Sequence, residues 1–173
     1  LGDVYKRQIL GSVAETMITN NYADHIYTLS KGISWITFQN ECAAIRIDDQ
    51  LCKQGKGITL YSSFKQNLKG DKIYTVFEDS EGDEWILTNK GISIIGKKQV
   101  DSDFPFQYIK EADGIIYLVS QSDKLASYNF KTRQFKFIEI PYHVSMINEV
   151  KKFDSNTLLL ATDNGLIIYK IKE

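Results

Sequence analysis

The stretch I-Y-T-V-F-E-D-S-E-G-D-E-W-I-L-T-N-K-G-I-S-I-I, residues 73–95, contains three predicted strands joined by two tight turns. From Ile73 to Glu78 two sets of side chains alternate with the period of a β-strand. The polar segment that follows contains Gly82, which can adopt the positive φ that a tight turn needs. Trp85–Thr88 is too apolar for a strand with a solvated face, so we expect it in the middle of a sheet. A second turn and a third strand, Ile92–Ile95, complete the stretch.

Three other stretches repeat this arrangement of a strand, a turn and a second strand. They are I-Y-T-L-S-K-G-I-S-W-I-T-F (26–38), Y-I-K-E-A-D-G-I-I-Y-L-V-S (108–120) and V-K-K-F-D-S-N-T-L-L-L-A-T (150–162). A bulky residue, called the anchor here, lies three positions after a glycine in the first three repeats in chain order; in the fourth repeat, Asn156 replaces the glycine. Asparagine is the next best residue for a left-handed backbone. The anchors are Trp35, Trp85, Tyr117 and Leu159.

The spacing of the anchors indicates the fold. The pattern recurs about every 40 residues, and a fourth, more polar strand fits residues 134–140. No stretch of the sequence has capped helical periodicity, so we expect an all-β chain. Four-stranded units at this spacing are typical of β-propeller blades, whereas a β-sandwich would not repeat the same turn in register. We therefore expect the four anchors at equivalent places on four successive sheets, each at least half buried and with no helix between them.

The composition excludes several functional classes. The chain has 173 residues, of which 43% are hydrophobic and 25% are charged, as expected for one globular domain. The 21 basic and 22 acidic residues nearly cancel. This balance argues against nucleic acid or membrane contact, since both partners require a concentrated positive surface. No apolar run approaches the ~20 residues of a membrane-spanning helix.

The N-terminus differs in character from the rest of the chain. Residues 3–8 read D-V-Y-K-R-Q, which matches one reading frame of a transposon end used in sequencing libraries. We interpret residues 1–8 as a library scar and residues 9–173 as the partial propeller; the alternative is a natural strand or arm. If the scar interpretation is correct, the true start is missing, and the lack of a signal peptide gives no information about location.

Two segments carry a resemblance to a known family. Phe77–Ile95 and Leu158–Tyr169 resemble the two-component regulator propeller repeat, which has an apolar strand, D-x-x-G-x-x-W-I-G-T, and then G-L with an aromatic residue. The chain departs from this pattern at Leu87 and Ala161, which replace the usual glycine before threonine, and the first repeat lacks the aspartate before its glycine. The resemblance implies an open arc of about four four-stranded blades from a seven-bladed propeller.

The same resemblance implies a function. These repeats form the periplasmic sensor region of hybrid two-component histidine kinases of Bacteroidetes. A carbohydrate ligand, the remaining blades and domains of the same chain, and a homodimer of the full-length sensor are the implied partners. No cofactor is implied, and the segment is expected to be non-enzymatic. Two alternatives stay open: a propeller enzyme such as a glycosidase or lyase, and a structural or secretion-associated propeller.

The sequence does not identify catalytic, ligand-binding or metal-binding residues. A sialidase Asp-box on the turn before Trp85 would need Asp at Ser80 and Ser at Glu78, so the motif fails twice. Sialidase chemistry also needs an arginine cluster, and the chain has only three arginines, which are widely spaced: Arg7, Arg46 and Arg133. A glycosidase would need paired carboxylates at the central channel, but the acidic residues lie mainly in predicted turns.

The sequence shows no recognised metal-binding motif, and it leaves the pairing of the two cysteines open. Asp79, Glu81 and Asp83 lack the spacing of a calcium loop, so we interpret them as a solvated turn. The two histidines, His25 and His143, lie in different repeats and do not form a zinc motif. Two cysteines flank a predicted strand and turn, and either a disulfide or two free, partly buried thiols is compatible with their spacing: Cys42 and Cys52.

Overall fold

The computed structural model describes residues 23–38, 43–62, 68–70, 72–97, 100–101, 105–120, 124–129, 132, 134–140 and 143–171. These residues form four antiparallel sheets, each built from consecutive strands of the chain. The expected all-β architecture with propeller-like sheets is therefore confirmed. The interpretation of residues 1–8 as a library scar falls outside the described residues and stays a prediction.

Each sheet is a simple meander in which every strand pairs with the next one along the chain. The first sheet comprises β1 (Ala23–Thr28), β2 (Ile33–Phe38), β3 (Ala43–Asp48) and β4 (Ile58–Ser62). The second comprises β5 (Ile73–Glu78), β6 (Glu84–Thr88), β7 (Gly91–Ile94) and β8 (Val100–Asp101). The third comprises β9 (Phe106–Ala112), β10 (Ile115–Ser120), β11 (Leu125–Asn129) and β12 (Gln134–Ile138). The fourth comprises β13 (Ile147–Asp154), β14 (Thr157–Thr162) and β15 (Gly165–Lys170).

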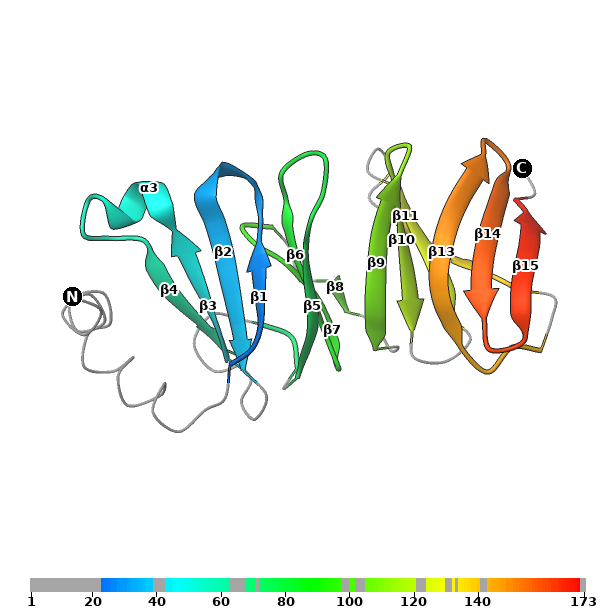
Figure 1. Cartoon of the computed structure of the whole chain (residues 1–173), viewed down its shortest axis with the longest axis horizontal. Coiled ribbons are helices and arrows are strands. Elements are labelled where there is room, and N and C mark those ends of the chain that lie inside the picture. Colours follow the sequence, from blue (N-terminus) through cyan, green and yellow to red (C-terminus); the bar gives the residue numbers. More distant parts are fainter. Residues whose placement is uncertain are drawn as a thin grey trace.

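The sheets stand side by side in chain order, with the first and fourth sheets at opposite ends of the row (Figure 1). The first strands of neighbouring sheets approach each other, as β5 does with β9 and β9 with β13. The first strands therefore line the inner edge of an open arc, and the last strands of the sheets lie at its outer edge. This is the arrangement of successive propeller blades.

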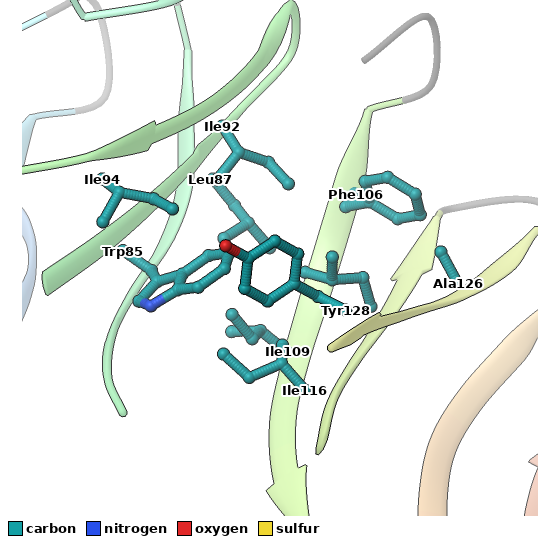
Figure 2. Close-up of a cluster of buried hydrophobic side chains, with 10 residues drawn as sticks. Trp85, Leu87, Ile92, Ile94, Phe106, Ile109, Ile116, Ala126 and Tyr128 are labelled. Atoms are coloured by element: carbon teal, nitrogen blue, oxygen red, sulfur yellow. The ribbon is translucent and has the colours of Figure 1, made fainter. Parts of the chain in front are cut away.

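Three apolar clusters fill the spaces between successive sheets. Trp35 packs with Val76 and Ile86 between the first and second sheets. Trp85 and Leu87 pack with residues of the third sheet, and the Trp85 and Tyr128 rings meet edge to face at 5.1 Å (Figure 2). Tyr117 packs against the fourth sheet. Because neighbouring side chains of a strand face opposite ways, β6 and β10 each contribute to the clusters on both of their sides.

The four anchors lie where the sequence predicts them. Each is on the second strand of its own sheet: Trp35 on β2, Trp85 on β6, Tyr117 on β10 and Leu159 on β14. The first three are at most 1% exposed, and Leu159 is partly buried. Each of the first three faces the next sheet, which confirms that the repeats occupy equivalent positions.

Two details differ from the sequence-based expectation. A single helical turn, α3 (Asp49–Cys52), lies between Trp35 and Trp85, where no helix was expected. It forms because the Asp48 carboxylate accepts the backbone N–H groups of Gln50 and Leu51, which caps the turn. It joins β3 to β4 within one sheet and does not separate the sheets. The fourth sheet contains three strands rather than four within the described residues.

Candidate functional site

The inner edge of the arc carries half-buried tyrosines from three successive sheets. Tyr27 of β1 donates its hydroxyl to the Tyr74 carbonyl oxygen of β5 at 3.4 Å. The Tyr27 ring stacks on His25 with 5.9 Å between the ring centroids. The Lys72 ammonium lies 5.4 Å from the centroid of the Tyr74 ring, within cation–π range. Burial raises the pKa of Tyr27, so the hydroxyl is a hydrogen-bond donor at neutral pH.

A second polar group occupies the inner edge between the third and fourth sheets. Lys110 of β9 forms an ion pair with Glu149 of β13 at 3.2 Å, and their side chains are 37% and 55% exposed. The hydrogen bond that Lys110 donates to Glu149 raises the pKa of Lys110. Burial raises the pKa of the neighbouring Tyr108, against the opposing effect of the Lys110 charge. A tyrosine, an ammonium and a carboxylate thus lie together and remain accessible to solvent.

These groups are suited to binding a polar, ring-shaped ligand. Tyrosine rings offer flat apolar faces, and the adjacent charged groups can donate and accept hydrogen bonds. The inner-edge carboxylates are already engaged: Asp24 lies 3.1 Å from His25, and Glu149 contacts Lys110. A pair of facing carboxylates, as glycosidase chemistry requires, is not formed by these described groups.

The turn before Trp85 has a buried role that sequence reasoning missed. Asp79 is only 5% exposed, which corrects the expectation of a solvated turn at this residue. One carboxylate oxygen accepts the backbone N–H groups of Glu81 and Asp83, and the other accepts the Trp85 indole N–H at 2.7 Å. Both oxygens are occupied by N–H donors, so the turn is held by its own aspartate. An aspartate six residues before a tryptophan was the available signal.

Contacts at three successive interfaces, called staples here, join the turn after the first strand of one sheet to the first strand of the next sheet. The backbone N–H and hydroxyl of Ser30 donate to Glu78, and those of Ser80 donate to Glu111, with N···O distances of 2.6 Å in both cases. In the third interface, an ion pair replaces these bonds: Lys152 and Asp113, 3.0 Å apart.

A buried charge cluster adds to the contact between the first and second sheets. Glu84 of β6 accepts the Trp35 indole N–H at 2.6 Å and three hydrogen bonds from Arg46, the shortest at 2.8 Å. The Glu84 and Arg46 side chains are 10% and 17% exposed. The hydrogen bonds that Arg46 donates to Glu84 raise the pKa of Arg46. This arginine, considered above for sialidase chemistry, therefore joins two sheets.

The other residues singled out in the sequence are not brought together. His25 lies on β1, and His143 precedes β13, whose sheet is at the other end of the arc. Cys52 has a free, partly buried thiol, and Cys42 lies outside the described residues. In the part of the chain that the structure describes, no three His, Cys, Asp or Glu side chains form a group that could bind a metal ion. None of the described helices is long and apolar enough to cross a membrane.

Comparison with solved structures finds the same fold in bacterial sensor proteins. The chain is similar to the extracellular domain described as belonging to the one-component system BT4673 of B. thetaiotaomicron, with 22% identity and a TM-score of 0.64, over 87% of this chain and 22% of that chain. It is also similar to the extracellular domain of the hybrid two-component system BT3049 of B. thetaiotaomicron, with 21% identity and a TM-score of 0.60, over 86% of this chain and 20% of that one.

A propeller enzyme shares the fold as well. Virginiamycin B lyase from Staphylococcus aureus matches with 20% identity and a TM-score of 0.58, over 84% of this chain and 54% of the lyase. The chain spans about a fifth of the length of the two sensor domains. No protein-family model and no curated protein matches the sequence.

Proposed function

We propose that this chain is a ligand-sensing propeller segment of a periplasmic two-component sensor histidine kinase, with an oligosaccharide as its ligand. The similarity to the extracellular domains of two B. thetaiotaomicron signalling systems carries the proposal. In this proposal the segment binds the ligand and transmits the signal, and the kinase activity belongs to another part of the full-length protein.

The inner edge supplies suitable chemistry for a sugar ligand. Tyr27, Tyr74 and Tyr108 come from three successive sheets, so one extended ligand lying along the edge would meet all three. Sugar rings stack their C–H faces on aromatic rings, and their hydroxyls pair with charged side chains. Lys110 and Glu149 lie beside Tyr108 and are exposed enough to supply such pairs.

Calorimetric titration of the chain with soluble oligosaccharides of at least four sugar units tests the ligand. We expect one class of glycan to bind and the Tyr108→Ala variant to bind it at least about tenfold more weakly, as for a lost stacking residue. Phe137→Ala is the matched control, because Phe137 is an exposed aromatic residue on the outer strand β12. Equal weakening by both variants, or no binding of any glycan, would refute the oligosaccharide assignment.

The sensor assignment has a separate test in the flanking coding sequence. We expect reading frames continuous with this chain to encode a membrane-spanning helix and a histidine kinase. A flanking enzyme domain would instead favour the enzyme alternative.

A propeller lyase is the second candidate, because virginiamycin B lyase shares the fold. The engaged inner-edge carboxylates and the paired Lys110 argue against it. Incubating the chain with virginiamycin B and following its retention in reversed-phase chromatography tests this candidate. An unchanged antibiotic is expected, and turnover would replace the sensor assignment.

A further inference from the structure

The hydroxyl group of the third anchor, Tyr117, is buried without a hydrogen-bond partner among the described residues. Tyr117 is 1% exposed and packs between the third and fourth sheets. Burial, together with the negative charge of Asp113, raises the pKa of Tyr117, so its hydroxyl is a neutral donor. A buried donor without an acceptor has lost its hydrogen bonds to water and gained none in return, which disfavours the packing of the fourth sheet on the third.

The polar atoms of the other two aromatic anchors are satisfied. The Trp85 indole N–H is paired within its own sheet, and the Trp35 indole N–H donates to Glu84 of the next sheet. Glu84 directly precedes the anchor of the second sheet along β6, and Leu158 holds the same place before the anchor of the fourth sheet. Because Leu158 has an apolar side chain, the fourth sheet offers Tyr117 no side-chain acceptor at this place.

The ion pairs of the first and third interfaces differ in the same direction. Across the first interface, Arg46 makes charge-assisted hydrogen bonds to both carboxylate oxygens of Glu84, and both side chains are largely buried. Two ion pairs cross the third interface, and their carboxylates are 55% and 74% exposed: Lys110–Glu149 and Lys152–Asp113. Ion pairs so open to solvent add little to stability. Of the two sheets at the ends of the arc, the fourth is therefore the more weakly held.

We propose that the fourth sheet is the mobile unit of the arc: β13, β14 and β15 separate together from the third sheet while the first three sheets stay packed. Opening this interface lets water bond to the Tyr117 hydroxyl, whereas opening the first interface breaks bonds that are already made. The consequence for a ligand rests on the proposed function. Lys110 and Glu149 lie on opposite sides of the opening interface, so a ligand that contacts both favours the closed state.

Thiol labelling compares the two interfaces at matched positions. Val150 of β13 and Val76 of β5 each precede the residue paired with the anchor, are 1% and 5% exposed, and face the preceding sheet. Val150→Cys and Val76→Cys are made in a chain whose native cysteines, Cys42 and Cys52, are replaced by alanine. The two substitutions nearly conserve volume, so each thiol stays buried until its interface opens. A fluorescent maleimide reports the reaction at nanomolar protein, where association through exposed apolar surface is weak.

We expect the thiol of Val150→Cys to react at least about tenfold faster than that of Val76→Cys. Its rate should also depend less on urea, because a local opening exposes less surface than global unfolding. Tyr117→Phe removes the unpaired hydroxyl, so it should slow the reaction of Val150→Cys at least about fivefold. Equal rates for the two thiols, or no effect of Tyr117→Phe, would overturn the proposal.

Arg46→Met is the matched perturbation of the first interface, because it leaves the buried Glu84 carboxylate without its cation. We expect it to speed the reaction of Val76→Cys at least about tenfold and to leave the rate of Val150→Cys unchanged within about twofold. The first interface stays packed when only the fourth sheet opens, so its strength does not enter that equilibrium. An equal acceleration of both thiols would mean that the arc opens as one cooperative unit, which would also refute the proposal.

Hydrogen exchange of the unsubstituted chain guards against a misfolded cysteine variant. β14 and β2 are the second strands of the two end sheets, and each is paired on both sides. We expect the β14 amides to exchange at least about tenfold faster than those of β2, and Tyr117→Phe to slow them. Equal exchange in the two strands, or faster exchange in β2, would contradict opening at the third interface. Both measurements use the chain without a ligand, so a failure of glycan binding leaves their outcome unchanged.

Discussion

Gly82 lies in the β5–β6 turn with a φ of +83°, which confirms the backbone conformation that the sequence predicts. A Cβ at this position would meet the flexible end of Lys31 at 3.3 Å and Oε1 of Glu78 at 4.0 Å, so the cost of substitution comes from the backbone. We expect Gly82→Val to lower the free energy of unfolding by about 1–2 kcal/mol, measured by urea denaturation. Gly82→Asn should lose less, since asparagine tolerates positive φ. Equal stability of the valine variant and the parent would contradict this account.

Asp79 offers a second test at the scale of one residue. Its carboxylate satisfies three N–H donors, including the buried indole of Trp85. Asp79→Ala leaves these donors without their acceptor, and we expect a loss of about 2–3 kcal/mol in unfolding free energy. The control is Glu81→Ala, an exposed acidic residue of the same turn, which should change stability by less than about 0.5 kcal/mol. Similar losses for the two variants would mean that the Asp79 hydrogen bonds do not stabilise the turn.

The difference between Asp79 and Trp85 shows what sequence reasoning could reach. The anchor Trp85 was predictable because hydrophobic period and turn spacing are local properties. The role of Asp79 was missed although its spacing from Trp85 was a signal, because the hydrogen bond and the burial of the carboxylate depend on how the indole folds over it. Gly82 predicted the turn for a similar reason: the positive φ that a tight turn needs is also a local property of the chain.

At the scale of elements, the staples between sheets make a pH-dependent contribution. Hydrogen bonds from the Ser30 hydroxyl and backbone lower the pKa of Glu78 below its ordinary value. A carboxylate with a lowered folded-state pKa stabilises the fold above its unfolded pKa, and this contribution disappears as the pH falls through the folded value. The contact between Glu78 of β5 and Ser30 in the β1–β2 turn therefore weakens below about pH 4.3.

Glu78→Gln tests this contribution directly. We expect the variant to unfold at lower urea concentration than the parent at pH 7, by about 0.5 kcal/mol, which is typical of an exposed charged contact. At pH 3 the same carboxyl is largely protonated in the unfolded chain, so the ionic contribution to stability is partly lost and the gap between the two proteins should shrink. Glu81→Gln serves as the control and should show little difference at either pH. A gap for Glu78→Gln that is as large at pH 3 as at pH 7 would exclude an ionic origin.

The staples also mark the limit of prediction for elements. Each repeat could be recognised from its own sequence, and the four sheets and their anchors followed. Contacts such as those of Ser30 with Glu78 join residues of different repeats, so they emerge only when the stacking of sheets is known. The inner-edge tyrosines were missed for the same reason: Tyr27 and Tyr74 are neighbours only because β1 and β5 lie side by side.

At the scale of the whole molecule, stability comes from packing between sheets, as in other repeat proteins. Each internal sheet buries both faces, whereas the fourth sheet buries one. Phe153 of β13 is 70% exposed, and Leu166 and Ile168 of β15 are 66% and 64% exposed. Contiguous apolar patches beyond roughly a few hundred Å² are rare on soluble monomers, because water contact with such patches favours association.

We therefore expect the 173-residue chain, expressed alone, to self-associate at micromolar concentration, as measured by light scattering. Ile168→Glu places a charge on this exposed apolar face of the fourth sheet, opposite Leu159 in the strand pairing, so it should shift the chain towards monomer. Phe137→Glu is the control, because Phe137 is 49% exposed but lies on the outer strand of the third sheet, away from this face. An equal effect of both variants would implicate general surface hydrophobicity. A monodisperse parent monomer with one cooperative melting transition would mean that other residues of the same chain cover this apolar face.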